Sequence, residues 1–218
     1  MNTKPIFSFE KAVNLSKPYW IMIAALWLMG FCYVVMYGTF DSFLRLTTIH
    51  TPFLDSFFSL FTNVGDGLFA VAVGIVFFVF KYRRIACNIL FSFLLSGLLA
   101  QIGKNLMPFL RPSAYFRDVA GIPVHTLEAT VWGNKSFPSG HSTTAFALLG
   151  VLILFYPTSR WNILWVLLAF LVGYSRIYLA SHFLDDVLAG AAIGVFTAMI
   201  CYIISNNLFY KKLNYFPR

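Results

Sequence analysis

Long apolar segments separated by short polar loops are the feature that most restricts how this chain can fold. They lie at residues 20–40, 68–80, 85–103, 142–156, 161–174 and 187–205. A helix needs about 20 apolar residues to cross a bilayer, so the 13-residue segment 68–80 needs part of 63–67 as well. Charged residues make up 11% of the chain, against about 25% in soluble domains. We therefore predict an all-α, polytopic integral membrane protein with six transmembrane helices.

Positive charge in the loops predicts how these helices are oriented. Six crossings place both chain ends and the loops at 81–84 and 157–160 on one side of the membrane, and this side carries ten of the 16 Lys and Arg residues. Its one acidic residue is Glu10. Cytoplasmic loops are enriched in Lys and Arg, so both termini are predicted to be cytoplasmic. We expect a bacterial inner (plasma) membrane protein with a single domain, 1–218, made of a cytoplasmic lead at 1–18, a six-span core at 20–205 and a cytoplasmic tail at 206–218.

Residues 41–66, between the first two apolar segments, are mixed in character. Thr51-Pro52 is typical of a helix start. Apolar residues then recur at helical spacing, at Phe53, Phe57, Leu60, Phe61 and Val64. This pattern predicts either an additional amphipathic helix near 52–64 that lies in the membrane interface or an extension of the next span.

The net charge of +8 does not indicate a nucleic-acid partner, because the Lys and Arg residues occupy short loops beside apolar segments rather than a basic run interleaved with aromatic residues. Three cysteines, Cys32, Cys87 and Cys201, are far apart within apolar segments. Their spacing fits neither a disulfide framework nor a metal site.

Ionisable residues gather on the outer side of the predicted bundle. The third segment ends there with Lys104, the fourth begins after His141, the fifth ends near Arg176 and the sixth begins after His182. Ionisable groups within an almost uniformly apolar sequence are costly and usually functional. Because the orientation came from the loops alone, this convergence independently predicts a site on the extracytoplasmic face.

His182 and Asp186 are four residues apart. On a helix that begins near Ser181 they would share a face, and the carboxylate would accept a hydrogen bond from one imidazole nitrogen. Arg176 precedes His182 by six residues, about 120° around a continuous helix. The chain must therefore break between Arg176 and His182 if both are to face one site.

Two further clusters suit an anion. Lys104 and Arg111 are seven residues apart and would project from nearly the same side of a helical stretch, and Pro112 favours extended backbone at Arg111 as the chain leaves the helix. Ser139-Gly140 offers backbone N–H groups at a helix start, without a side chain on the glycine to obstruct an oxyanion. Taken singly, the cations also fit interface anchoring, and Ser139 fits an ordinary helix cap.

Together these residues resemble the three signature motifs of the type 2 phosphatidate phosphatase superfamily, the membrane lipid phosphate phosphatases that are related in their site to vanadium haloperoxidases. The matching positions are Lys104, Arg111, Pro112, Pro138, Ser139, Gly140, His141, Ser175, Arg176, His182 and Asp186. The resemblance implies a hydrolase that removes phosphate from a lipid phosphate or diphosphate, without a metal or other cofactor. Phosphatidylglycerol phosphate, phosphatidate, polyprenyl diphosphate and lipid A all remain open as substrates.

The resemblance also implies a role for each site residue. His182 is expected to be the nucleophile that forms a phosphohistidine, and Asp186 is expected to fix its tautomer. His141 is expected to protonate the leaving oxygen and then to activate water. The phosphoryl oxygens are expected to be held by Lys104, Arg111, Ser139, Gly140 and Arg176.

Two other functions remain open on the residues alone. A phosphate-lipid binder or transporter would keep the anion site but would not need His141 or Asp186. A metalloprotein would use His141, His182 and Asp186 as ligands. Polar residues of the loop 113–135 are expected either to contact a lipid head group or to support the loop itself: Tyr115, Arg117, Asp118, His125, Glu128 and Trp132. The oligomeric state is not predicted.

Overall fold

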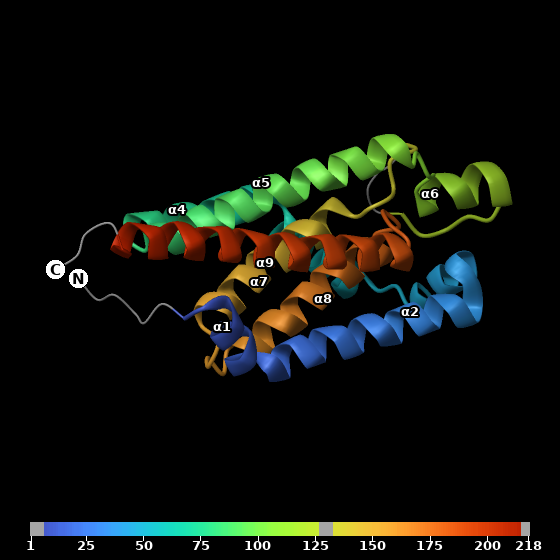
Figure 1. The fold of residues 1–218 in the computed structure, drawn as a ribbon. Helices are drawn as coiled ribbons and strands as arrows, with labels where there is room; N and C mark the ends of the chain where they lie inside the picture. Colours follow the sequence, from blue (N-terminus) through green and yellow to red (C-terminus); the bar gives the residue numbers. More distant parts are fainter. Residues whose placement is uncertain (1–6, 127–132, 215–218) are drawn as a thin grey trace.

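The computed structural model describes residues 7–126 and 133–214, and every regular element in these two stretches is helical (Figure 1). The elements are α1 (Phe9–Leu15), α2 (Lys17–Leu46), α3 (Pro52–Phe61), the 3₁₀ turn η1 (Thr62–Gly65), α4 (Gly67–Val79), α5 (Arg83–Leu106), α6 (Pro112–Tyr115), the π-helical turn η2 (Phe116–Ala120), α7 (Gly140–Phe155), α8 (Asn162–Tyr178) and α9 (Leu184–Asn214).

Helix α7 forms the centre of the bundle, and every residue from Ser142 to Leu154 is buried. Figure 1 shows it between α2 on one side and α5 with α9 on the other. Glycines allow α9 to lie very close to α7. A β-carbon on Gly190 would come 2.5 Å from the carbonyl oxygen of Ser139, and one on Gly194 would come 2.5 Å from that of Thr143. Small residues at such contacts are how membrane helices approach closely, so these glycines fix the start of α7 against α9.

Helix lengths agree in part with the predicted spans. Helices α2, α5 and α9 are each long and apolar enough to cross a membrane, and α3 with η1 and α4 would make a fourth span, bent by 55°. Helices α7 and α8 are apolar but shorter, with 16 and 17 residues. The described residues are therefore all-helical, as predicted, with several helices long and apolar enough to cross a membrane, whereas the number of crossings stays a prediction.

Helix α2 extends beyond the predicted segment 20–40 and ends at Leu46. Gly38, with φ of 77°, interrupts it, because this conformation is left-handed and breaks the helix. Trp27 anchors the helix to the bundle by donating from Nε1 to the carbonyl of Leu188. The apolar pattern missed the last turn because residues beyond the glycine are more polar.

Helix α3 begins as the sequence predicts. Thr51 caps it by accepting from the Leu54 amide, and Pro52 occupies its first turn. Phe53 and Leu60 are exposed, whereas Phe58 is buried against Tyr174 and Tyr178 of α8. The helix therefore turns one apolar face outward and one onto the bundle, and either predicted location of the segment near 52–64 is compatible with this arrangement.

The two ends of the described chain meet at one end of the bundle (Figure 1). Tyr202 and Asn206 of α9 both donate hydrogen bonds to the carbonyl of Phe7. Helix α1 lies within the predicted cytoplasmic lead, where no helix was predicted, and packs Ala12 against Leu154 and Tyr202. The loop that contains α6 lies at the opposite end of the bundle, so the predicted site and the chain ends are far apart.

Candidate active site

The turn between α8 and α9 carries His182. Helix α8 closes with a Schellman motif, in which the amide of Ser181 bonds to the carbonyl of Arg176 and the amide of Ala180 bonds to that of Ile177. Ala180 adopts the left-handed conformation that this motif requires, with φ of 52°. The predicted break between Arg176 and His182 is confirmed. The predicted helix start near Ser181 is wrong, because the motif carries the chain on to Leu184 before α9 begins.

His182 therefore precedes the helix that carries Asp186, rather than sharing a helical face with it. Its Nδ1 atom still lies 3.4 Å from Oδ2 of Asp186, and both side chains are buried. The same oxygen accepts a hydrogen bond of 2.9 Å from the amide of Phe183. The carboxylate is thus held by the backbone of the turn and faces one edge of the imidazole, which leaves Nε2 on the other edge.

Ser136 is a site residue that the sequence analysis missed. Its hydroxyl donates to Oδ2 of Asp186 over 2.5 Å and lies 3.5 Å from Nδ1 of His182. The residue is completely buried. A small polar residue directly before Phe137-Pro138 was the available signal, but nothing local distinguished it from an ordinary loop serine.

The start of α7 is joined directly to this carboxylate turn. Ser139 caps the helix by accepting from the Ser142 amide, and its own amide donates to the carbonyl of Asp186 over 3.0 Å. His141, in the first turn of α7, packs against Gly65 of η1, where a β-carbon would lie 3.0 Å from its side chain. The bond between Ser139 and Asp186 therefore joins the segment that carries His141 to the one that carries His182.

Three cations surround the same region, although Lys104 and Arg111 do not lie on one helix as predicted. Arg176 is buried on the last turn of α8 and donates to Oγ1 of Thr62 over 2.7 Å. Lys104 lies on α5, and its Nζ would be 3.7 Å from a β-carbon added to Gly140. Arg111 follows the end of α5 and points Nη1 at the carbonyl of Ser181, 3.5 Å away.

The proposed helical face shared by Lys104 and Arg111 is wrong. Helix α5 ends at Leu106, and the chain is extended at Arg111, with ψ of 155°, before α6 begins at Pro112. A residue before proline is driven out of helical conformation, and Met107, which precedes Pro108, ends α5 in this way with φ of −128° and ψ of 78°. The extended backbone that Pro112 predicts at Arg111 is confirmed. The two cations reach the same region through the bend in the chain rather than through helical spacing.

The electrostatic environment favours a neutral His182, which lies in the turn outside the predicted spans. Burial lowers the pKa of its imidazole well below 6.5, and the positive charges of Arg176, Arg111 and Lys104 lower it further. A neutral imidazole keeps a lone pair for reaction. The surrounding positive charge favours a bound anion.

The metal-ligand interpretation of His141, His182 and Asp186 is not supported. Within the described residues, the group of three His, Cys, Asp or Glu side chains whose ligand atoms meet closely enough to hold an ion is a different one: His50, Asp55 and His125. The groups gathered around His182 include three cations, which suit an anion. Of the loop residues, Glu128 and Trp132 lie outside the described stretches, and Arg117 pairs with Asp118 at the surface.

Comparisons with known proteins agree with this arrangement. Residues 85–210 match the family model described as the PAP2 superfamily. The chain is 32% identical over 166 residues to a lipid A 4′-phosphatase of Bacteroides thetaiotaomicron, covering 73% of each protein. The crystal structure of Aquifex aeolicus LpxE aligns with a TM-score of 0.65 and 30% identity over 78% of this chain and 94% of that one.

A second solved structure supports the fold alone. The PAP2-type phosphatidylglycerolphosphate phosphatase of Bacillus subtilis aligns with a TM-score of 0.59 and 22% identity, covering 92% of this chain and 96% of that one. Fold and comparisons together define the class, an integral membrane phosphatase that hydrolyses phosphoric esters. The chain belongs to the PAP2 superfamily, since the matched residues are more than half of its length.

Proposed function

We propose that this protein removes phosphate from a membrane lipid phosphate or diphosphate at the extracytoplasmic face, through a phosphohistidine intermediate and without a metal ion. The observation that carries this proposal is a buried imidazole, His182, held by Asp186 on one edge and surrounded by the charges of three cations. A neutral nucleophile and a concentrated positive field are the two requirements of phosphoryl transfer that a protein can supply.

In the proposed first step, Nε2 of His182 attacks phosphorus, and the bond from phosphorus to the lipid oxygen breaks. Protonated His141 gives its proton to that oxygen, and the neutral lipid alcohol leaves. Asp186, anchored by Ser136 and the Phe183 amide, holds the Nδ1–H tautomer and stabilises the positive charge that the ring gains. For a diphosphate the leaving group is the lipid monophosphate instead.

In the second step, neutral His141 takes a proton from water, and the resulting hydroxide attacks the phosphohistidine. The bond from phosphorus to Nε2 breaks, which releases inorganic phosphate and restores neutral His182. Lys104, Arg111 and Arg176, with Ser139 and the Gly140 amide, bind the phosphoryl oxygens in both steps. The proton that His141 gives up in the first step is replaced from water in the second, so water is the only reactant besides the lipid.

A groove among α4, α7 and α8 supports a lipid substrate. Its volume is about 710 Å³, and apolar side chains line most of it, including Ala145 and Val172. Ala145 lies one helical turn after His141, and Val172 lies one turn before Arg176, so the groove begins beside the candidate site. We propose that an acyl or prenyl chain lies in this groove while its phosphate reaches the cations. Lipid A is the first candidate, because the Bacteroides relative carries that activity in its name.

The topology of the proposal follows the loop charges. We propose one domain over 1–218 with six spans and both termini in the cytoplasm, an arrangement in which the site lies outside. The contact of α1 with the end of α9 supports a common side for both chain ends. We further propose that α3 lies in the interface, with Phe53 and Leu60 turned to lipid.

The test is phosphate release by the purified full-length protein in EDTA. The panel is lipid A, phosphatidate, phosphatidylglycerol phosphate and a polyprenyl diphosphate in detergent micelles. We expect turnover of at least one lipid, acid-labile phosphate on the protein during turnover, and a loss of about 10³-fold or more in His182→Ala. Binding of all four lipids without turnover would favour the binder or transporter instead, and wild-type turnover by His182→Ala would overturn the assignment of the nucleophile.

A further inference from the structure

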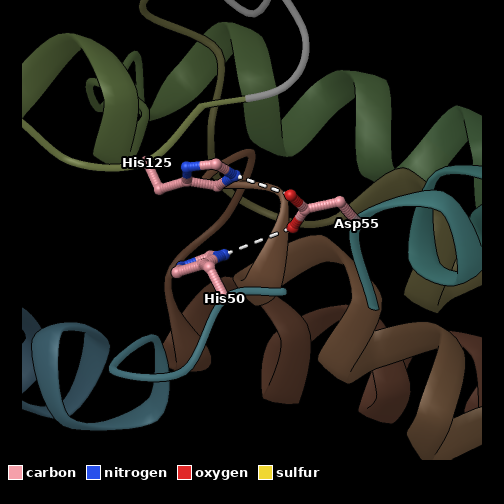
Figure 2. Close-up of side chains that lie close together, drawn as sticks. All are labelled: His50, Asp55 and His125. Atoms are coloured by element: carbon pink, nitrogen blue, oxygen red, sulfur yellow. Dashed lines mark ion pairs between the residues drawn. The ribbon is translucent and has the colours of Figure 1, made fainter. Parts of the chain in front are cut away.

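A second cluster of two imidazoles and one carboxylate lies outside the proposed active site (Figure 2). His50 belongs to the connection between α2 and α3, Asp55 to the first turn of α3, and His125 to the stretch that follows η2. None of the three has a role in phosphoryl transfer as described above. From their geometry we propose that these side chains form a binding site for a divalent transition-metal ion, with Zn²⁺ as the ion that suits them best.

The ligand atoms already converge. Nδ1 of His50 lies 3.6 Å from Oδ1 of Asp55, and Nε2 of His125 lies 3.3 Å from Oδ2. One ligand atom from each residue can be chosen so that all three lie within 4.8 Å of one another. Bonds of about 2.0–2.2 Å to a tetrahedral zinc ion place ligand atoms roughly 3.3–3.6 Å apart. Small side-chain movements would therefore complete the site.

One of these atoms lacks a hydrogen-bond partner among the described residues. Nδ1 of His50 is buried and makes no hydrogen bond in the described residues, and its distance to Asp55 is longer than a hydrogen bond. Figure 2 shows the two rings turned toward the carboxylate, one toward each oxygen. A buried polar atom without a partner is costly. An ion between the three groups would satisfy this nitrogen.

The surroundings of the carboxylate also fit a metal ligand. The hydroxyl of Tyr178 donates to Oδ1 of Asp55 over 2.6 Å, and Tyr178 is fully buried at the end of α8. The ring of Tyr178 also packs on the ring of His50, with centroids 4.5 Å apart. Hydrogen bonds from such outer partners orient metal-ligating carboxylates. Asp55 is thus held with Oδ2 directed at His125, while Oδ1 faces both Tyr178 and His50.

The donor set selects the class of ion. Two imidazoles and one carboxylate suit zinc and its neighbours in the first transition row, whereas Mg²⁺ and Ca²⁺ prefer oxygen ligands alone. The His125 side chain is 40% exposed, so water can reach the ion and fill a fourth position. The ion would tie the stretch after η2 to α3 and, through Tyr178, to the end of α8 that carries Arg176.

Cobalt provides the direct test, because Co²⁺ takes the place of Zn²⁺ and absorbs visible light. The full-length protein, purified without a histidine tag, stripped with EDTA and desalted, is titrated with CoCl₂ and then with ZnCl₂. We expect one equivalent of Co²⁺ to bind with a tetrahedral spectrum and to be displaced by Zn²⁺. His50→Ala, His125→Ala and Asp55→Asn should each lose the spectrum, and Tyr178→Phe should bind about tenfold more weakly.

His141→Ala is the matched control, because it removes an imidazole from the other cluster and should bind Co²⁺ like wild type. Turnover in EDTA, which needs none of the three ligands, shows that a ligand variant is folded, and Asp55→Asn preserves shape if an alanine variant is not. Slower amide exchange of residues 121–126 with ZnCl₂ should accompany binding. The proposal is overturned if wild type binds no Co²⁺, if a folded ligand variant binds it as tightly as wild type, or if His141→Ala abolishes the spectrum.

Discussion

The two imidazole–carboxylate clusters of this protein contain similar side chains in opposite surroundings. Around His182 and Asp186 the neighbouring cations are Arg176, which is buried with them, and Arg111 and Lys104, which are half-buried. Around His50, Asp55 and His125 a neutral hydroxyl, that of Tyr178, donates to the carboxylate, and the three side chains are partly exposed. The same chemical groups therefore favour an anion in one place and a cation in the other, because the nearby charges decide which ion is stabilised.

Replacing the carboxylate of each cluster by an amide should give the largest difference in kcat between the two clusters. Asp186→Asn removes the charge that supports the imidazolium and permits the wrong tautomer of His182, so kcat should fall by about 10³-fold or more. Asp55→Asn should leave kcat in EDTA within about twofold of wild type. Phosphate release under identical conditions measures both, and equal losses in the two variants would show that the clusters are not functionally distinct.

Ser136→Ala should have a smaller effect confined to the anion site. The hydroxyl positions Asp186 without touching the substrate, so its loss should lower kcat by about tenfold and leave KM nearly unchanged. Co²⁺ binding at the other cluster should not change. A rise in KM with normal kcat would instead indicate a contact with substrate, and unchanged kinetics would remove Ser136 from the site.

The smallest expected effect is a shift in pH dependence. Burial lowers the pKa of His182 below 6.5, and repulsion by Arg176, Arg111 and Lys104 lowers it further. The protonated ring cannot attack, so kcat/KM should fall as the pH drops through the lowered pKa of His182. Arg111→Met removes one repelling charge. The pKa should rise, and the acid limb of the kcat/KM profile should move to higher pH.

Arg117→Met is the control for this shift, since Arg117 pairs with Asp118 at the surface and should leave the limb in place. A limb that stays fixed or moves to lower pH in Arg111→Met would mean that another group controls it. His141 would then be the first group to test for control of the acid limb.

Helix positions and the main site residues were accessible from the sequence because they depend on local pattern. The apolar run at 68–80 became α4 (Gly67–Val79), and the six-residue separation of Arg176 from His182 required the break that the Schellman motif provides. Both inferences use only neighbouring residues. The end of α5 and the start of α9 were missed, because the backbone at Met107 decides the first and the left-handed Ala180 decides the second.

Contacts between distant segments were beyond such reasoning. Ser136 meets Asp186 across 50 positions, and Arg176 meets Thr62 across 114. His125 approaches Asp55 from a loop that carries no repeating pattern. Nothing in the spacing of these residues marks them as neighbours, because packing of the helices brings them together.

The close approach of α7 and α9 sets a boundary for protein engineering. Gly190 and Gly194 leave no room for any side chain against the backbone of α7, so libraries that vary these positions will be depleted of active members whatever substrate is offered. Attempts to change lipid preference should instead randomise the apolar wall of the groove between α4 and α8, where altered side chains reshape the cavity without separating His141 from Asp186.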